Sequence, residues 1–163
     1  MGEERPRRKW EPREMRLCSE YCTTYHHKAR ILTRVRLGRY PGELLKYISE
    51  EEELRLLTLW RRWADAVAIY PDRVVIIECT ILPKPGKIQQ LLLYKRLFYE
   101  TPEFEDIKHL PVEMELVYAV EDPHIVKLCE EYGIKAVYFK PRWIEEYLAQ
   151  LYPRHRREPI QPI

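Results

Sequence analysis

This sequence has no long apolar run, only five glycines and almost no net charge. No stretch approaches the ~20 consecutive apolar residues of a membrane-spanning helix, and the charged N-terminus lacks the apolar segment of a signal peptide. The formal net charge of +2 gives no overall positive field that would point to nucleic acid. The four cysteines lack the spacing of a disulfide framework. We therefore expect an intracellular protein without a membrane segment, in the cytoplasm or inside a virus particle.

The chain nevertheless has the composition of one folded domain. Of its 163 residues, 45% are hydrophobic and 33% are charged, as in globular domains with a strongly charged surface. Arginine and lysine crowd both ends, where they can reach phosphates or an acidic partner, unless they are only solvated tails. We predict a basic arm over residues 1–16, a single domain over 17–152 and a tail over 153–163. The 13 prolines beside so few glycines favour a heat-adapted source.

Apolar periodicity, interrupted by proline and glycine, predicts an α/β domain. A helix is indicated before residue 31. Apolar residues occupy both faces of the strands within residues 63–82, so helices should cover the sheet on both sides. The expected strands cover residues 31–37, 63–70, 73–82, 112–120 and 134–139, and the further helices cover 42–60, 87–99, 123–132 and 141–152.

A predicted hairpin around residues 71–72 brings two acids together. If its loop has two residues, counting back along both strands places Asp65 directly opposite Glu78. Cross-strand partners lie ~5 Å apart on one face of the sheet, so two carboxylates there must be neutralised. A hard divalent cation, Mg²⁺ or Mn²⁺, is one way to do so. A loop one residue longer or shorter would instead put the acids on opposite faces.

The alternative to a metal is an internal ion pair, in which Arg61, Arg62 or Lys87 neutralises the acids. The helix after the hairpin bears on this choice, because Lys87, Gln90 and Tyr94 fall within a ~60° arc of an ideal helix. A cation, an amide and a phenol on one stripe can bind phosphate, position a nucleic-acid strand and hydrogen-bond a nucleophilic water. A merely solvated helix face is the simpler interpretation of this stripe.

A second candidate metal site lies near the N-terminus. Cys18, Cys22 and His26 fall at i, i+4 and i+8, which offers three ligands to zinc if the segment is helical. A structural zinc site would also need further ligands, and the sequence shows no second pair. Small buried thiols on a helix face are therefore the competing interpretation.

The order and spacing of these segments resemble the PD-(D/E)XK nuclease superfamily. The shared pattern is a helix, a strand with Asp65, a strand ending Ile77-Glu78-Cys79-Thr80, and a helix with Gln90-Leu-Leu-Leu-Tyr94. The Gln-x-x-x-Tyr element is similar to that of the RecB and lambda-exonuclease branch. The resemblance implies a restriction-endonuclease-like core, with a central mixed sheet flanked by helices in αβββαβ order, and metal-dependent hydrolysis of DNA.

The resemblance also implies a set of metal ligands. Asp65, Glu78 and the backbone carbonyl of Cys79 would bind Mg²⁺ or Mn²⁺. Glu43 is similar in placement to the helix-borne acid of archaeal Holliday-junction resolvases, and residues 50–53 compete for that role. Exonuclease, endonuclease and junction-resolvase activities all stay open, as does assembly into a homo-oligomer.

One position departs from the family pattern. The lysine of the (D/E)-x-K motif is Thr80 here, which removes a charge that stabilises the transition state. We expect Lys87 to supply that charge from the next helix, while Gln90, Tyr94 and Thr80 orient the substrate. The alternative is an inactive nuclease-fold protein that binds DNA or serves as a structural part of an assembly such as a virus particle.

Overall fold

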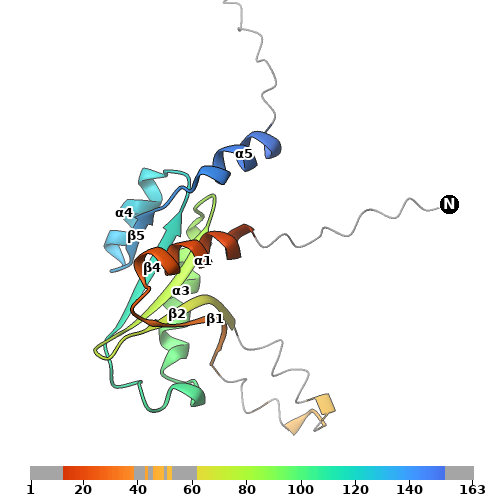
Figure 1. Ribbon diagram of the computed structural model, residues 1–163. Helices are drawn as coiled ribbons and strands as arrows, with labels where there is room; N and C mark the ends of the chain where they lie inside the picture. The colour runs from red at the N-terminus through yellow and green to blue at the C-terminus, as the bar shows by residue number, and fades with distance from the viewer. Residues whose placement is uncertain (1–12, 39–42, 44–45, 50, 53–61, 153–163) are drawn as a thin grey trace, which may run out of the picture.

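The computed structural model describes residues 13–38, 43, 46–49, 51–52 and 62–152. Within these residues a five-stranded sheet is flanked by helices on both faces (Figure 1). None of the described helices is long and apolar enough to cross a membrane. The elements are α1 (Arg13–Tyr25), β1 (Arg30–Leu37), β2 (Arg62–Ile69), β3 (Val74–Thr80), α3 (Pro85–Phe98), the short 3₁₀ helix η2 (Pro102–Phe104), β4 (Val112–Tyr118), α4 (Pro123–Glu131), β5 (Lys135–Tyr138) and α5 (Arg142–Leu151).

The sheet is mixed, and its strands follow one another in the order β1-β2-β3-β4-β5. β2 pairs antiparallel with both β1 and β3, whereas β3, β4 and β5 run parallel to one another. Parallel neighbours need a crossover, and α3 and α4 provide the two crossovers. The predicted α/β core with a mixed sheet and αβββαβ order is therefore confirmed.

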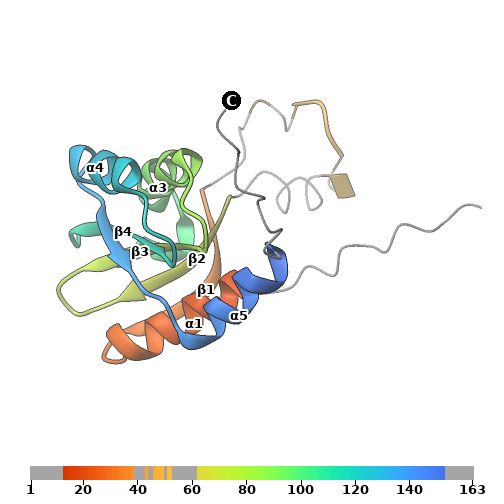
Figure 2. The same ribbon diagram turned by 90° about the horizontal axis from the view of Figure 1, so that it is seen from above.

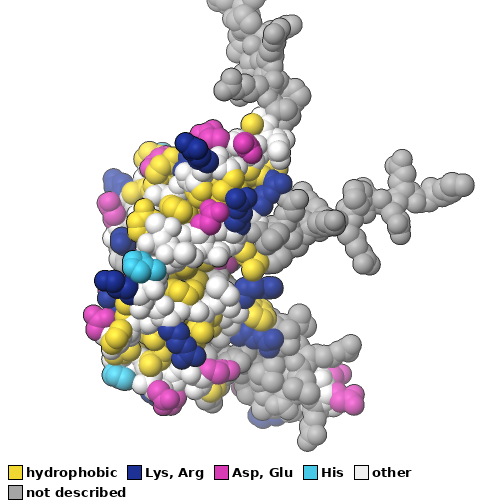
Figure 3. All heavy atoms as spheres, viewed as in Figure 1, with side chains coloured by type: hydrophobic (Ala, Val, Ile, Leu, Met, Phe, Trp, Pro, Cys, Tyr) yellow, Lys and Arg dark blue, Asp and Glu magenta, His cyan; other side chains and the backbone are white. Residues whose placement is uncertain are grey.

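Helices cover both faces of the sheet, as the apolar strands predicted. Figure 2 shows α3 and α4 on one side of the sheet and α1 and α5 on the other. Every residue of β3 is buried, because its alternate side chains enter two different cores. Val74 and Ile76 join the core under α3, while Val75 and Ile77 join the core under α1. On the face in Figure 3, cationic and anionic side chains are interspersed among hydrophobic ones, in keeping with the small net charge.

Local sequence explains where the helices begin and end. Pro85 and Pro123 open α3 and α4, where a missing backbone N–H breaks no helical hydrogen bond. The Asp122 side chain caps α4 by accepting a hydrogen bond of 3.1 Å from the backbone N–H of His124. Gly133, with a φ of 68°, follows α4 in the left-handed conformation that glycine adopts readily.

The N-terminal helix starts earlier than the sequence suggested. α1 begins at Arg13, inside the segment that we expected to be an arm over residues 1–16. Its buried side chains recur at helical spacing and pack on the sheet, so the helix belongs to the domain. The predicted helix over 42–60 lies largely outside the described residues. The buried side chains of α1 are Leu17, Cys18, Tyr21 and Cys22.

The β2–β3 hairpin has the predicted register. Its two-residue loop is closed by a hydrogen bond of 2.9 Å from the Tyr70 N–H to the Arg73 carbonyl. The backbone ladder runs from Ile69 opposite Val74 to Ala66 opposite Ile77 and then stops. The next positions on the two strands are 65 and 78, so the two acids face each other where the backbone pairing ends.

Candidate active site

A pocket of about 730 Å³ lies where β2, β3 and the start of α3 meet, and α1 and α5 contribute to its walls. Five of the side chains that the sequence placed in the site line this pocket: Asp65, Glu78, Lys87, Gln90 and Tyr94. The two acids come from neighbouring strands, and the other three come from one face of α3. The acids predicted from the hairpin register and the helix residues predicted from the helical repeat therefore line the same pocket.

The two carboxylates are held by reciprocal hydrogen bonds. Glu78 Oε1 accepts a hydrogen bond of 3.1 Å from the backbone N–H of Asp65, and Asp65 Oδ2 accepts one of 2.9 Å from the N–H of Cys79. These bonds replace backbone ladder bonds beyond the last paired residues, Ala66 and Ile77. Each carboxylate therefore has one oxygen anchored to the opposite strand, which orients its second oxygen.

Lys87 neutralises part of this charge. Its Nζ lies 3.0 Å from Glu78 Oε2 and donates a hydrogen bond to it. The Glu78 side chain is only 2% exposed, whereas that of Lys87 is 22% exposed. The ion pair that the sequence offered as an alternative to a metal thus exists, with Lys87 as the partner. Arg61 and the side chain of Arg62 lie outside the described residues.

Burial raises the pKa values of both acids. Burial raises the pKa of Glu78 to about 7, and the nearby Asp65 carboxylate adds to this effect. Burial also raises the pKa of Asp65, although the Cys79 N–H and Lys87 oppose the shift. Burial by itself would lower the pKa of Lys87, but the carboxylates outweigh it and the pKa rises. The site therefore favours the uptake of further positive charge, as a proton or a cation.

A third acid enters the pocket from a segment that the sequence interpretation had assigned to the arm. Glu14, in the first turn of α1, lines the pocket and contributes to the raised pKa of Asp65. Glu43 is exposed and is not among the residues that line the pocket, and most of the segment around it lies outside the described residues, so its role as a helix-borne acid stays a prediction. Glu14 was missed because the charged sequence around it hid the start of an amphipathic helix.

Few side chains in the pocket could act as ligands to a metal ion. Among the residues that the structure describes, no group of three or more His, Cys, Asp or Glu side chains is arranged to hold a metal ion. Two carboxylates are present, with Glu14 at a greater remove near Thr80. The Cys79 carbonyl, predicted as a further ligand, stays a prediction.

Of the three predicted orienting residues, two line the pocket. Gln90 is exposed and Tyr94 is buried, and both are in its wall. Thr80 is buried and is not part of the wall. Its hydroxyl donates a hydrogen bond of 2.8 Å to the Leu82 carbonyl and lies 3.3 Å from Glu14 Oε1. The substrate-orienting role of Thr80 stays a prediction.

Within the part of the chain that the structure describes, Cys18 and Cys22 belong to no group of three or more metal-ligating side chains. Cys18, Cys22 and Cys79 are free, buried thiols in the core under α1. A hydrogen bond with Cys18 and burial both raise the pKa of Cys22, so its thiol stays protonated at neutral pH. His26 lies beyond the end of α1, and its Nε2 is 2.8 Å from Glu115 Oε2. The competing interpretation of small buried thiols therefore fits the structure.

A second buried polar cluster surrounds His26, away from the pocket. Glu115 Oε2 accepts hydrogen bonds from the Tyr21 hydroxyl, at 2.7 Å, and from His26. His26 Nδ1 lies 2.5 Å from the Tyr70 hydroxyl. Burial by itself would raise the pKa of Glu115, but the hydrogen bonds from His26 and Tyr21 outweigh it and lower the pKa. The cluster connects α1, the hairpin and β4, which indicates a structural role.

Removal of this imidazole should destabilise the fold without touching the pocket. We expect His26→Ala to lower the free energy of unfolding by about 2–4 kcal/mol, because it leaves Glu115 buried with one partner fewer. Urea unfolding at pH 7 measures this loss, and the exposed neighbour His27→Ala is the matched control. Equal stabilities of the two variants would contradict a structural role for the cluster.

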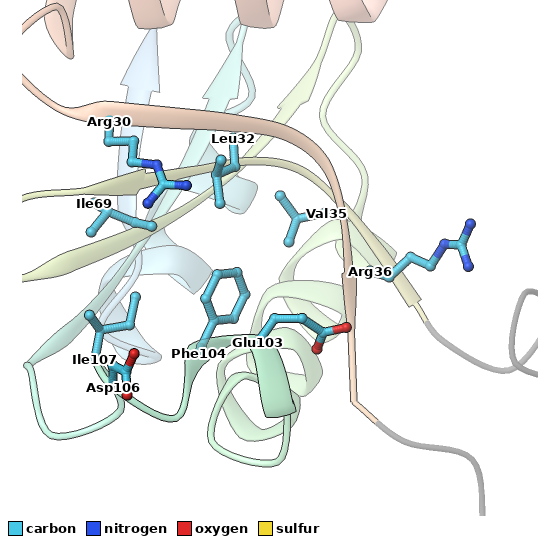
Figure 4. A pocket seen from close by; sticks show the side chains of 9 residues that line it. All are labelled: Arg30, Leu32, Val35, Arg36, Ile69, Glu103, Phe104, Asp106 and Ile107. Atoms are coloured by element: carbon cyan, nitrogen blue, oxygen red, sulfur yellow. The ribbon is translucent and has the colours of Figure 1, made fainter.

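Another hollow, of about 500 Å³, lies beside the edge strand β1. Figure 4 shows Leu32 and Phe104 pointing into it, and the Arg36 side chain pointing away. Its two acids, Glu103 and Asp106, are exposed on the surface. This hollow lacks the buried, hydrogen-bonded carboxylates of the larger pocket, which is the better candidate for chemistry.

Comparison with known proteins adds no function. No protein-family model matches the chain, and no curated protein matches it. Among solved structures, the chain is similar to the crystal structure of a protein of unknown function, AF1548. The two share 14% sequence identity over 90% of this chain and 72% of that one, with a TM-score of 0.47. Function therefore rests on the chemistry of the pocket.

Proposed function

We propose that this protein is a Mg²⁺- or Mn²⁺-dependent deoxyribonuclease that hydrolyses phosphodiester bonds at Asp65 and Glu78. The observation that carries the proposal is the pair of carboxylates, each anchored to the opposite strand, with the Lys87 ammonium 3.0 Å from one of them. The acids lie on the second and third strands of an αβββαβ arrangement. That placement is the one expected from the resemblance to the PD-(D/E)XK superfamily.

The donor chemistry fits a hard divalent cation. Asp65 and Glu78 present carboxylate oxygens, which Mg²⁺ and Mn²⁺ prefer to nitrogen or sulfur ligands. Backbone N–H groups hold one oxygen of each acid, so the pair is already oriented before a cation binds. The two acids together bring more negative charge than Lys87 offsets, which favours a cation over a neutral ligand.

The remaining side chains support hydrolysis of a phosphodiester. A bound divalent ion supplies an activated water and polarises the phosphate. The Lys87 ammonium is in place to counter negative charge that develops as the phosphorus–oxygen bond breaks. Gln90 and Tyr94, in the same wall, can donate hydrogen bonds to phosphate or sugar oxygens and hold the scissile strand.

Cleavage of labelled DNA tests the proposal. Single-stranded, duplex and branched substrates should be cut in Mg²⁺ or Mn²⁺ and left intact in EDTA. Asp65→Asn should abolish cleavage, because the amide keeps the shape but removes the charge. Asp72→Asn, an exposed acid in the loop of the same hairpin, is the matched control and should cut normally. Cutting that survives Asp65→Asn would indicate a contaminant and would overturn the proposed site.

The second candidate function is a nuclease fold that binds DNA or a partner without cutting. Two observations favour it: Thr80 stands where the family has lysine, and Lys87 already pairs with Glu78. In that case DNA should bind equally well with and without Mg²⁺, and no form of the protein should cut any substrate.

A further inference from the structure

An exposed tryptophan stands beside the two acids. Trp63 precedes Asp65 by two residues on β2, lines the same pocket and is 39% exposed. It belongs to neither of the hydrophobic cores. A large, partly exposed ring beside a candidate catalytic pair offers a surface on which an aromatic group of a ligand can stack.

Two guanidinium groups approach this ring. The Arg36 guanidinium carbon lies 4.5 Å from the ring centroid of Trp63, and that of Arg34 lies 5.7 Å away. Arg34 also lines the pocket that contains the acids, whereas Arg36 lines the neighbouring hollow. Arg36 thus lies nearer to the ring than Arg34, and part of the Trp63 surface stays exposed.

Arg34 itself has an unusual backbone. Its φ is 50°, a left-handed conformation that side chains other than glycine adopt rarely. The β1–β2 ladder pairs residues on either side of it, Thr33 with Ala66 and Val35 with Ala64, so Arg34 lies opposite Asp65. Such backbone strain concentrates at functional sites, where the surrounding structure holds it in place.

A second pair of arginine and aromatic residues contributes to the same pocket. The Arg13 guanidinium carbon lies 4.0 Å from the ring centroid of Tyr147, and both residues line the pocket. Lys84 lines it as well. Cations that contact phosphates, together with aromatic rings that stack on bases, are the groups with which proteins bind a single nucleic-acid strand.

We propose that the strand at this site is unpaired, with one base stacked on Trp63 and the adjoining phosphates held by Arg34 and Arg13. The inference rests on the proposed nuclease function and names its substrate class. Inside a duplex both faces of every base are covered by neighbouring bases, so Trp63 can stack only on a base that is unpaired or at an end. Single-stranded DNA, overhangs and junction arms offer such bases.

Binding without cleavage tests this inference. We would measure the affinity for a labelled oligothymidylate, and for a closed-end duplex of equal charge, by fluorescence anisotropy in EDTA. Trp63→Ala should weaken single-strand binding by about 10-fold and change duplex binding little, and Trp63→Phe should retain most of the affinity. Tyr99→Ala is the control, because Tyr99 is also exposed but does not line the pocket.

Arg34→Gly removes the guanidinium group without straining the backbone, because glycine adopts a positive φ readily. Its thermal midpoint should equal or exceed that of the wild type. Its single-strand affinity should fall, with a shallower dependence of affinity on salt, because one phosphate contact is lost.

The results separate this inference from the nuclease proposal. Trp63-dependent single-strand binding without any cleavage in Mg²⁺ would support the stacking inference and overturn the nuclease. Cleavage that depends on Asp65, with Trp63→Ala binding single strands as tightly as the wild type, would overturn the stacking inference and keep the nuclease. Equal losses on single strands and on the closed duplex would also overturn it, since stacking on an unpaired base must discriminate between the two.

Discussion

Replacement of Glu78 by glutamine is expected to lower metal-dependent cleavage by about 10³-fold or more, because it removes half of the carboxylate pair. The side chain is nearly isosteric, so it can still accept the hydrogen bond from the Asp65 N–H. Its amide nitrogen, however, is a donor and cannot pair with the Lys87 ammonium, which now donates to Glu78 at 3.0 Å. The exposed acid Glu113→Gln, on β4, is the matched control for loss of one charge.

The same substitution should change how stability depends on pH. Burial and Asp65 raise the pKa of Glu78 from 4.5 to about 7, so between these values the folded protein holds a proton that the unfolded chain releases. Stability from this group therefore falls as pH rises from about 5 to 7, by about 3 kcal/mol, and then levels off. In Glu78→Gln this fall should be absent. Urea unfolding in EDTA at several pH values measures the difference, and parallel curves for the two proteins would contradict the assignment.

A bound cation should oppose the loss of stability that accompanies ionisation of Glu78. Mg²⁺ binds the ionised acids, so its stabilising effect should be larger at pH 8 than at pH 5.5, where protons compete for Glu78. The thermal midpoint of the wild type in Mg²⁺ and in EDTA gives the comparison. An effect of Mg²⁺ that persists undiminished in Glu78→Gln would place the cation elsewhere.

Lys87→Met should have the second largest effect, a loss of about 10²-fold to 10³-fold in the rate of cleavage. Methionine keeps most of the aliphatic stem but removes the ammonium group. Because the charge of Lys87 lowers the pKa of Glu78, its removal should raise that pKa further and move the rise of activity to higher pH. The rate of DNA cleavage, measured from pH 5.5 to 9.5, gives both the loss of activity and the shift of the pH profile.

The control is Lys84→Met, an exposed lysine that lines the same pocket. It should leave the pH profile in place. If Lys87→Met lowered stability but left both the rate and the pH profile unchanged, Lys87 would be only a structural partner of Glu78. The lysine missing from the family motif at Thr80 would then have no replacement in the following helix.

The part of the site that could be predicted from sequence is the part set by short-range geometry. A two-residue loop determines the register of a hairpin, so the meeting of Asp65 and Glu78 followed from counting along two adjacent strands. The helical repeat likewise placed Lys87, Gln90 and Tyr94 on one face of α3.

Contacts between distant segments could not be predicted in this way. Glu14 lies beside Thr80, 66 positions along the chain, and His26 pairs with Glu115, 89 positions away. Arg34 faces Asp65 only because β1 pairs with β2. Nothing in the local sequence around Glu14 distinguished a pocket acid from a charge on a solvated arm.

The sequence by itself therefore determined the order of strands and helices and the core of the candidate site, since turn length and residue periodicity act over a few neighbouring positions. Only the tertiary structure decided which side chains surround that core: Glu14 from α1 in the pocket wall, Thr80 hydrogen-bonded to the Leu82 carbonyl, and Trp63 exposed beside Arg34. The physical reason is that packing of α1 and β1 against the sheet depends on the whole chain, and one charged or aromatic residue carries little local signal of where it will lie.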